Sequence, residues 1–503
     1  MTNVELFSQF WIIILFLIPM VLISRTVVAG TRYSPILIIV IFGLTMGYLL
    51  VFSGVSTPGL PEFPFVDLIA KTTIIALTVS FFVGGQELRK ILNNKNLDDV
   101  DVVVPATDEI ILGTSRTQFF YIIRAFFLLF GIEGLFRLIV TTNSSYSFYP
   151  LMAYIGLVLA VILIDNKAKI DNKHLYLRKG IYEIIAIILV LVSSYFIAEW
   201  ISSLIALPQI FFAMMISAGL GAILYNWTFG PTIRSLLFAG IPVVLAANFM
   251  VGGSRMGDAF EISGMNAVLT YGFFGQLFWM FGGIALIMLF AKSANARNLA
   301  PGMAGALSHS GLTGACTAGD FGKVAAQRAP IMINIPFFGH VFVFSILAVS
   351  AERGALWIVP AMIIVAIGVG LTILSLVNLR KANGIDQREI KALMQFSFGW
   401  QLTAVFGGLA ILSLSAMSME YAAMAQTSAI SHFGLFAAVQ EGMFGTDAAA
   451  LIPFIFSMPF LVHPLVFYMF GKAMENDGEM PIIPVYLLAA VGFVGIIISL
   501  FVF

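Results

Sequence analysis

Apolar residues occur in long uninterrupted runs along this chain, separated by short polar segments. A run of about 18 or more apolar residues is long enough to cross a bilayer as a helix. Fourteen such runs lie near residues 7–23, 34–53, 67–88, 118–140, 149–165, 181–201, 208–225, 234–250, 267–291, 330–351, 354–379, 395–418, 447–471 and 482–503. The pattern predicts an all-α polytopic membrane protein of about fourteen transmembrane helices, forming one integral membrane domain over residues 1–503.

Composition supports this class and argues against several others. The chain has 503 residues, of which 60% are hydrophobic and 10% charged, with 26 basic and 26 acidic side chains. This balance gives no electrostatic case for a nucleic-acid partner. No phosphate-binding glycine motif or metal-ligand spacing occurs, and Cys316 is the single cysteine. We therefore expect no resident cofactor, with the lipid bilayer as the surrounding phase.

One segment, residues 300–328, is too rich in glycine and polar residues for an ordinary span. Between Gly302 and Arg328 it reads GMAGALSHSGLTGACTAGDFGKVAAQR. Glycine lets a helix break and expose backbone amides and carbonyls, and such backbone survives at membrane depth only inside protein or beside a wet cavity. The segment predicts a re-entrant element lining a polar site for a small solute.

Basic residues predict the orientation, because lysine and arginine concentrate in short cytoplasmic loops. With the N-terminus outside, nineteen basic residues fall in inner loops, and only Arg255 and Arg353 fall outside. This asymmetry holds only if residues 300–328 enter and leave on the cytoplasmic side. Both termini are then outside, in a bacterial cytoplasmic (inner) membrane.

Two further segments and one residue pair lead to structural predictions. Residues 89–117 are a cytoplasmic connection of mixed charge. Residues 419–446 have helical spacing of apolar residues and predict an outer interfacial helix; with two glutamates and no basic residue, this loop also argues against a membrane enzyme with clustered acids and arginines. Glu133 and Arg137 stand one helical turn apart and are expected to pair.

Candidate binding residues gather in residues 300–328. Neutral donors and acceptors come from Ser308, His309, Ser310, Thr313 and Thr317, among Gly311 and Gly314. Asp320 is a candidate Na⁺ or proton site, since hard cations prefer oxygen ligands; its alternative is a local pair with Lys323. Arg328 is placed either to grip a substrate carboxylate or to reach the cytoplasmic interface.

A second glycine-rich cluster, residues 251–266, lies on the predicted outer side. Its candidate substrate residues are Gly252, Gly253, Arg255 and Asn266, and its candidate ion ligands are Asp258 and Glu261, to which Glu87 of an earlier span is added. Two irregular polar elements entering from opposite faces are typical of inverted-repeat transporters. The alternative is an ordinary outer loop with an Arg255–Asp258 pair.

The passage SGLTGACTAGDFGKVAAQRAP resembles the glycine-rich re-entrant loop of bacterial sodium:glutamate symporters, with Gly311, Thr313, Gly314, Cys316 and Thr317 in the small-residue run and His309 near its entry. It is also similar to the related 2-hydroxycarboxylate (citrate and malate) transporters, where Gly319, Asp320 and Arg328 would hold corresponding positions. The resemblance centres on residues 302–340. It implies an inverted-repeat secondary transporter that couples Na⁺ entry to a small carboxylate.

These observations predict ion-coupled symport, with Na⁺ favoured over H⁺, of a small carboxylate such as glutamate or a dicarboxylate. The expected partners are a small anionic solute and Na⁺, and a homodimer is the assembly considered. The alternative is a cation/proton antiporter without an organic substrate, using Asp320, Asp258 or Glu261.

Overall fold

The computed structural model describes residues 16–27, 35–93, 115–140, 149–165, 173–205, 209–227, 230–291, 295–382, 387–415, 417–440 and 442–502. These residues form helices joined by turns, and none of them forms a named strand. The helices are α2 Pro35–Phe52, α3 Pro64–Lys71, α4 Thr73–Asn93, α6 Ser115–Val140, α7 Tyr149–Asp165, α8 Lys173–Ile205, α9 Gln209–Ile223, α10 Pro231–Ser235, η1 Leu236–Gly240, α11 Ile241–Ser254, α12 Met256–Glu261, α13 Met265–Phe290, α14 Ala296–Ala306, α15 Ser310–Ala318, α16 Gly322–Phe337, α17 His340–Arg353, α18 Ile358–Lys381, α19 Gln387–Leu412, α20 Met419–Ile430, α21 Phe433–Gln440, α22 Thr446–Ser457, η2 Met458–Val462, α23 His463–Glu475 and α24 Ile482–Val502.

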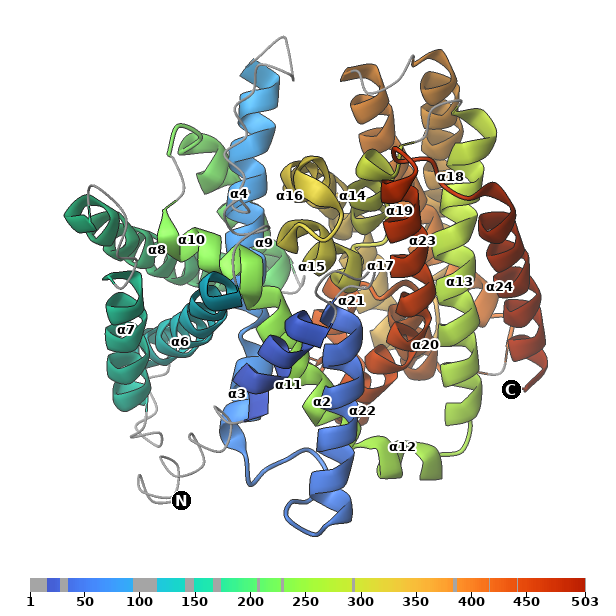
Figure 1. Ribbon diagram of the computed structural model, residues 1–503. Coiled ribbons are helices and arrows are strands. Elements are labelled where there is room, and N and C mark those ends of the chain that lie inside the picture. Colours follow the sequence, from blue (N-terminus) through green and yellow to red (C-terminus); the bar gives the residue numbers. More distant parts are fainter. Residues whose placement is uncertain are drawn as a thin grey trace.

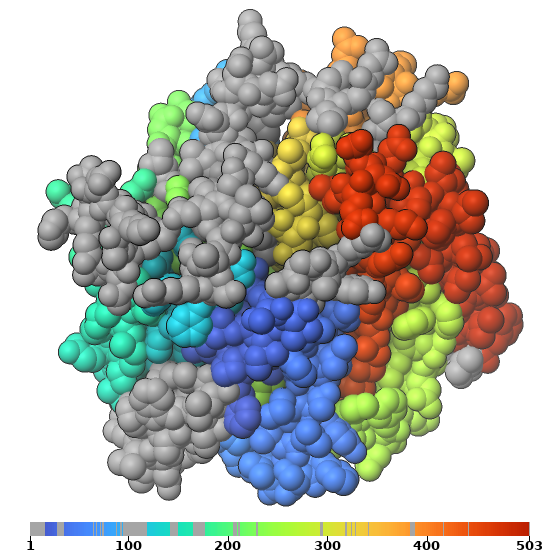
Figure 2. Space-filling view, viewed as in Figure 1, coloured from blue at the N-terminus to red at the C-terminus, as the bar shows by residue number. Residues whose placement is uncertain are grey.

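The architecture is consistent with a helical, multi-pass membrane protein. In the described part of the chain, nine helices are long and apolar enough to cross a bilayer, or ten if the bent pair α16 and α17 counts as one span. The fourteen spans counted from the sequence stay a prediction. Figure 1 shows the long helices standing side by side, and Figure 2 shows N-terminal helices (blue) meeting C-terminal ones (red) on one face.

The C-terminal half is built from two copies of one helical unit. The first copy runs from α13 through α14, α15, α16 and α17 to α18, and the second from α19 through α20, α21, α22 and α23 to α24. Each copy has a long helix, a helix broken near its middle, a bent helix that contains prolines, and a final long helix. We call them the first repeat (residues 265–381) and the second repeat (residues 387–502).

The sequence carries the same duplication. QLFWMFGGIAL in α13 matches QLTAVFGGLAI in α19, and SHSGL at the start of α15 matches SHFGL at the start of α21. The prolines of the bent helices recur too, Pro330 as Pro453 and Pro336 as Pro459, each 123 positions later. The two repeats therefore share residues as well as shape.

The last helix of each repeat packs on the first helix of the other. Small residues permit the close approach: a Cβ added at Gly368 of α18 would lie 2.8 Å from the carbonyl oxygen of Gly399 in α19, and one added at Gly492 of α24 would lie 2.4 Å from the backbone nitrogen of Phe278 in α13. Such small-residue crossings are a common way for helices to associate in membranes. The two repeats are thus packed against each other through their first and last helices.

Residues 419–446 differ from the sequence-based expectation of an outer interfacial helix. They form α20 and α21 with a break between them, and the residues of α20 from Ala422 to Ile430 are buried. The helical spacing predicted one amphipathic face, whereas most residues of α20 and α21 are buried on every side of the helix. Of the predicted connection 89–117, residues 94–114 lie outside the described residues.

Candidate functional site

The helices α14 and α15 form a hairpin that returns to the end where it begins. A Cβ at Gly305, near the end of α14, would lie 1.9 Å from the carbonyl oxygen of Met332 in α16. Gly305 and Met332 stand about equally far from the starts of their helices, Ala296 and Gly322. At 1.5 Å per residue, the starts of α14 and α16 lie at about the same depth. Helix α15, which joins them, therefore returns the chain to the level at which α14 begins.

The helices α20 and α21 do the same in the second repeat. The Ser428 hydroxyl of α20 donates to the Ile455 carbonyl of α22 at 2.8 Å. Each of these residues stands nine positions after the start of its helix, at Met419 and Thr446. The beginnings of α20 and α22 therefore lie at one level, and α21 returns toward it.

The two hairpins enter from opposite ends of the molecule. At the end of α13, Asn298 in the first turn of α14 donates to Glu389 in the first turn of α19 at 3.0 Å. Near the opposite end, Tyr271 of α13 donates to Gln426 of α20 at 2.9 Å. Since α13 has 26 residues, about 39 Å separate its two ends (Figure 1).

Both hairpins break at a serine in the left-handed conformation. Ser308 and Ser431 each have a φ of 47°, which costs energy for a residue with a side chain. The next amide closes the preceding helix in each case: His309 donates to Ala304 at 2.8 Å and His432 to Thr427 at 3.1 Å. This is the hydrogen bond that ends a helix in a Schellman motif.

A histidine then caps the inner helix of each hairpin. Nδ1 of His309 accepts from the backbone N–H of Leu312 at 3.1 Å, and Nδ1 of His432 accepts from Leu435 at 2.9 Å. A ring nitrogen that accepts carries no proton, so each capping ring is neutral or loses its cap. The two hairpins therefore break and restart their helices with the same hydrogen bonds.

The two tips touch at the centre. His309 and His432 form an isolated antiparallel bridge, in which Ser310 donates its N–H to the Ser431 carbonyl at 3.2 Å and Phe433 donates to the Ser308 carbonyl at 3.0 Å. All these residues are buried. The tips thus satisfy each other's backbone.

Two glutamines, one from the first helix of each repeat, hold the tips. Gln276 of α13 lies 2.5 Å from Nε2 of His309 and accepts from the Ser431 hydroxyl at 2.9 Å. Gln401 of α19 lies 3.1 Å from Nε2 of His432 and donates to the Ser308 hydroxyl at 3.2 Å. Each glutamine thereby joins both tips.

A second histidine packs against each tip histidine. The ring of His463 is 4.7 Å from that of His309, and the ring of His340 is 4.6 Å from that of His432. Both are completely buried. Each stacks on a phenylalanine, Phe460 at 4.1 Å and Phe337 at 4.2 Å. Four of the five histidines thus surround the tips.

Glycine makes room for these second histidines. A Cβ at Gly311 would lie 2.6 Å from Nε2 of His463, and a Cβ at Gly434 would lie 2.7 Å from Nε2 of His340. No hydrogen-bond partner is present for Nε2 of His463, for either ring nitrogen of His340 or for the Ser310 hydroxyl. Buried polar atoms usually have partners, so these atoms mark a place for a ligand or water.

The predicted residues of the first stretch divide into two groups. Ser308, His309, Ser310 and Gly311 lie at the tip of the first hairpin. Thr313, Gly314 and Thr317 follow along α15, of which Thr313 and Gly314 are buried.

The charged candidates are not among the residues that form the tips. Asp320 lies at the turn between α15 and α16, is exposed, and is within electrostatic range of Arg25. Arg328 is half-buried within α16. Glu87 belongs to α4. The three buried acidic residues of the described chain, Glu133, Glu183 and Glu389, come from α6, α8 and the first turn of α19.

Residues 251–266 do not form a hairpin. Gly252 and Gly253 lie in α11 and pack closely against the backbone of Pro453 and Leu44. A Cβ at either position would collide with a backbone carbonyl oxygen. Arg255 and Asp258 form an ion pair at 3.3 Å, and Glu261 and Asn266 are exposed. The glycines serve helix packing, so the element opposite the first hairpin is α20 and α21 instead.

Reasoning from the sequence missed the second half of the site. Taken one at a time, Gln276, Gln401, His340 and His463 are single polar residues in apolar stretches, and His432 is one polar residue of the segment 419–446. The signal was the internal repeat: Ser-His-x-Gly-Leu at 308–312 recurs at 431–435, and His340 recurs as His463. The repeat would have paired all four histidines.

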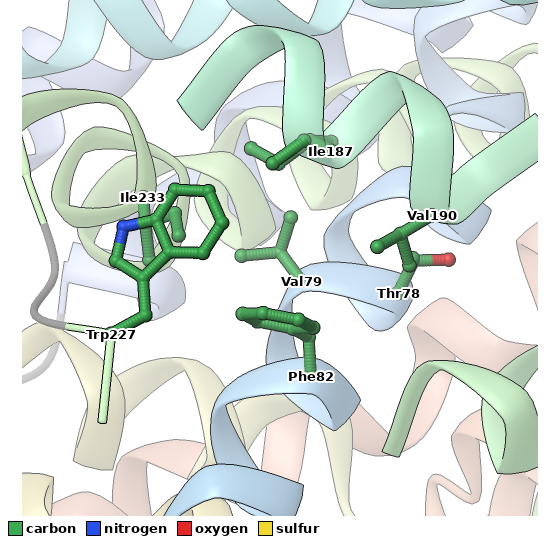
Figure 3. Close-up of a pocket in the computed structure, with 8 residues that line it drawn as sticks. Thr78, Val79, Phe82, Ile187, Val190, Trp227 and Ile233 are labelled. Atoms are coloured by element: carbon green, nitrogen blue, oxygen red, sulfur yellow. The ribbon is translucent and has the colours of Figure 1, made fainter. Parts of the chain in front are cut away.

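A separate pocket lies between α4 and α8 (Figure 3). It is lined by Thr78, Val79, Phe82, Ala186, Ile187, Val190, Trp227 and Ile233. The lining is almost entirely apolar, so it offers little to bind a polar solute, and it is not part of the tip site.

Comparison with known proteins gives no relative: no family model, no curated protein and no solved structure matches this chain.

Proposed function

We propose that this chain is a secondary active transporter that couples the entry of a small carboxylate to an ion gradient. The observation that supports it is the meeting of two hairpins, from opposite ends of an inverted repeat, at a buried polar centre. Secondary transporters built from inverted repeats bind their cargo at such broken helices, near mid-depth. Separation of one tip from the other would expose the centre to one side at a time.

The chemistry of the centre suits a small anionic solute. The inner helices α15 and α21 both begin at the tips, and the N-terminal end of a helix favours negative charge. Ser310 and the histidines add hydrogen-bonding groups that lie within the same buried space. A carboxylate would replace the bonds that the tips now make to each other.

The resemblance to sodium:glutamate symporters makes Na⁺ the first coupling ion to test, with the first hairpin entering from the cytoplasmic side. In proteoliposomes, we expect uptake of labelled L-glutamate, L-malate or citrate when an inward Na⁺ or pH gradient is imposed, and none without either. An uptake rate that is unchanged when both gradients are removed would contradict the proposal.

Cys316 tests the access of the first hairpin. It is the single cysteine and is buried in α15, so labelling reports one position. We expect slow reaction with a membrane-impermeant thiol reagent from the cytoplasmic side, slowed further by a transported carboxylate. Equal reaction with and without every carboxylate tested would count against binding at this hairpin.

Cation/proton antiport without an organic solute is the second candidate, favoured by the concentration of titratable rings at the centre. A proton flux that follows Na⁺ or K⁺ in vesicles free of organic anions would favour antiport. Proton flux that requires a carboxylate would favour symport.

A further inference from the structure

The hydroxyl groups of the inner helices distinguish the two hairpins. In α15, Ser310 and Thr313 stand three residues apart on one face; the corresponding positions of α21 are Phe433 and Phe436. The Ser310 hydroxyl is fully buried without a hydrogen-bond partner. The polar side of the centre therefore belongs to the first hairpin.

His463 is directed at this same turn. Its Nε2 lies 2.6 Å from the position that a Cβ of Gly311, the second residue of α15, would take. Its Nδ1 is 3.2 Å from the Pro459 carbonyl, and since a carbonyl can only accept, Nδ1 carries the proton of the neutral ring. Nε2 is then an unshared lone pair, which has no partner in the structure.

The surroundings of His463 are neutral. His309, from the tip, is the ionisable side chain that faces it among the described residues. Phe460 of η2 stacks on its ring, and Phe467 packs from its own helix; Gln276 of α13 reaches the neighbouring His309. A proton added to Nε2 would thus be a buried charge without a counterion.

We propose that the N-terminal turn of α15 binds one carboxylate together with one proton, held on Nε2 of His463. This rests on the transport function proposed above and names its coupling ion. The carboxylate accepts from the Ser310 hydroxyl, from the Ser310 N–H that the opened tip releases, and from the Nε2–H of His463. One carboxylate group and one proton are buried together, so this pair is neutral.

Coupling follows from the cost of burying a single charge. A carboxylate alone, or a protonated His463 alone, is an unpaired ion in an apolar interior, whereas the hydrogen-bonded pair is tolerated. The tips can therefore close when both the carboxylate and the proton are bound, or when neither is bound. Na⁺ prefers oxygen ligands such as carboxylates, and the tips present imidazole rings with no acidic residue among the described neighbours.

The test measures protons taken up when a carboxylate binds. The purified full-length protein is titrated with acetate, L-malate, citrate and L-glutamate near pH 7.5 by calorimetry in two buffers of different ionisation enthalpy. We expect about one proton per bound anion, because neutral His463 is the unprotonated acceptor at that pH. Binding with no proton uptake, or binding that requires Na⁺, would overturn the inference and leave carboxylate transport standing; absence of binding by every carboxylate would overturn both.

Variants locate the proton. His463→Gln should abolish proton uptake on binding and pH-driven accumulation, whereas its repeat counterpart His340→Gln should still take up the proton. Ser310→Ala should weaken carboxylate affinity about tenfold, equivalent to the loss of one hydrogen bond to a charged group, with the proton count unchanged. Loss of proton uptake in His340→Gln but not in His463→Gln would refute the assignment. If a variant fails to fold, the number of protons taken up by the wild-type protein still tests whether carboxylate and proton bind together.

Discussion

The hairpin of α14 and α15 and the hairpin of α20 and α21 share the residues that break the helix and cap its restart, but they differ along the inner helix. Both have serine in the left-handed conformation, a capping histidine and a glycine under a second histidine. On the inner helices, Ser310 and Thr313 of the first hairpin correspond to Phe433 and Phe436 of the second. The shared residues shape the backbone of the tips, and the differing ones give the first hairpin hydroxyl groups where the second has phenyl rings.

A second difference concerns how tightly each hairpin packs on the bent helix beside it. Gly305 in the first repeat corresponds to Ser428 in the second, and Met332 corresponds to Ile455. Ser428 has room for a side chain that bonds to the Ile455 carbonyl, while Gly305 lies directly against the Met332 carbonyl. The first hairpin is therefore less tolerant of added atoms.

The largest expected effect comes from Gly305→Ala. The new Cβ would lie 1.9 Å from a backbone oxygen, which forces the helices apart and should destabilise the fold by about 3 kcal/mol. The measurement is the thermal unfolding midpoint in detergent. Gly302→Ala in the same helix is the control, since its Cβ would meet nothing nearer than 3.8 Å. Equal midpoints for the two variants would contradict this account of packing.

Next in size is Gln276→Leu, which leaves His309 and Ser431 without their shared partner. Because both groups stay buried, we expect a loss of about 2 kcal/mol. Gln401→Leu, its repeat counterpart, should cost a similar amount. Unfolding midpoints of the two variants and the double variant show whether the glutamines act on one joined tip; fully additive losses would argue that the tips are independent.

A smaller effect is expected from the caps. His309→Ala and His432→Ala each remove the acceptor for a first-turn amide, which should cost about 1 to 2 kcal/mol. Asparagine is a good cap, so His309→Asn and His432→Asn should recover much of that stability. If asparagine destabilises as much as alanine, the ring contributes by packing rather than by capping.

The smallest effect lies outside both hairpins, in the turn between α2 and α3. Hydrogen bonds from Ser56 and Thr57 lower the pKa of Glu62 below its ordinary value. A lowered pKa stabilises the fold while the carboxylate is ionised, and that contribution is lost as pH falls below about 4. Unfolding midpoints between pH 7 and pH 3.5 should fall slightly more in the wild type than in Glu62→Gln; identical slopes would count against it.

The helical class was predictable because apolar runs of membrane length need no tertiary information. Local ion pairs were predictable for the same reason: Glu133 and Arg137 lie 2.8 Å apart, as their spacing suggested. Residues 300–328 were singled out by their glycines and hydroxyls, and the structure places a helix break at Ser308 within them. These features depend on neighbours in sequence.

The centre itself could not be read from local patterns. His309 and His432 touch because two hairpins from opposite ends meet, and a window of neighbouring residues carries no information about that meeting. Asp320 was favoured because a carboxylate among small residues suits a cation, yet it lies at the exposed turn after α15. In residues 251–266, Gly252 and Gly253 pack α11 closely against its neighbours, and a local pattern cannot distinguish a glycine used for helix packing from one used in a loop.

The exchange of outer helices between the repeats bears on how the chain is made. Helix α13 lies against α24, the last helix of the described chain. During synthesis, the first repeat lacks this flanking helix until α24 itself has been made. Biogenesis should therefore be sensitive to stop codons or deletions that remove α24, because the surface of α13 that α24 covers would then stay exposed.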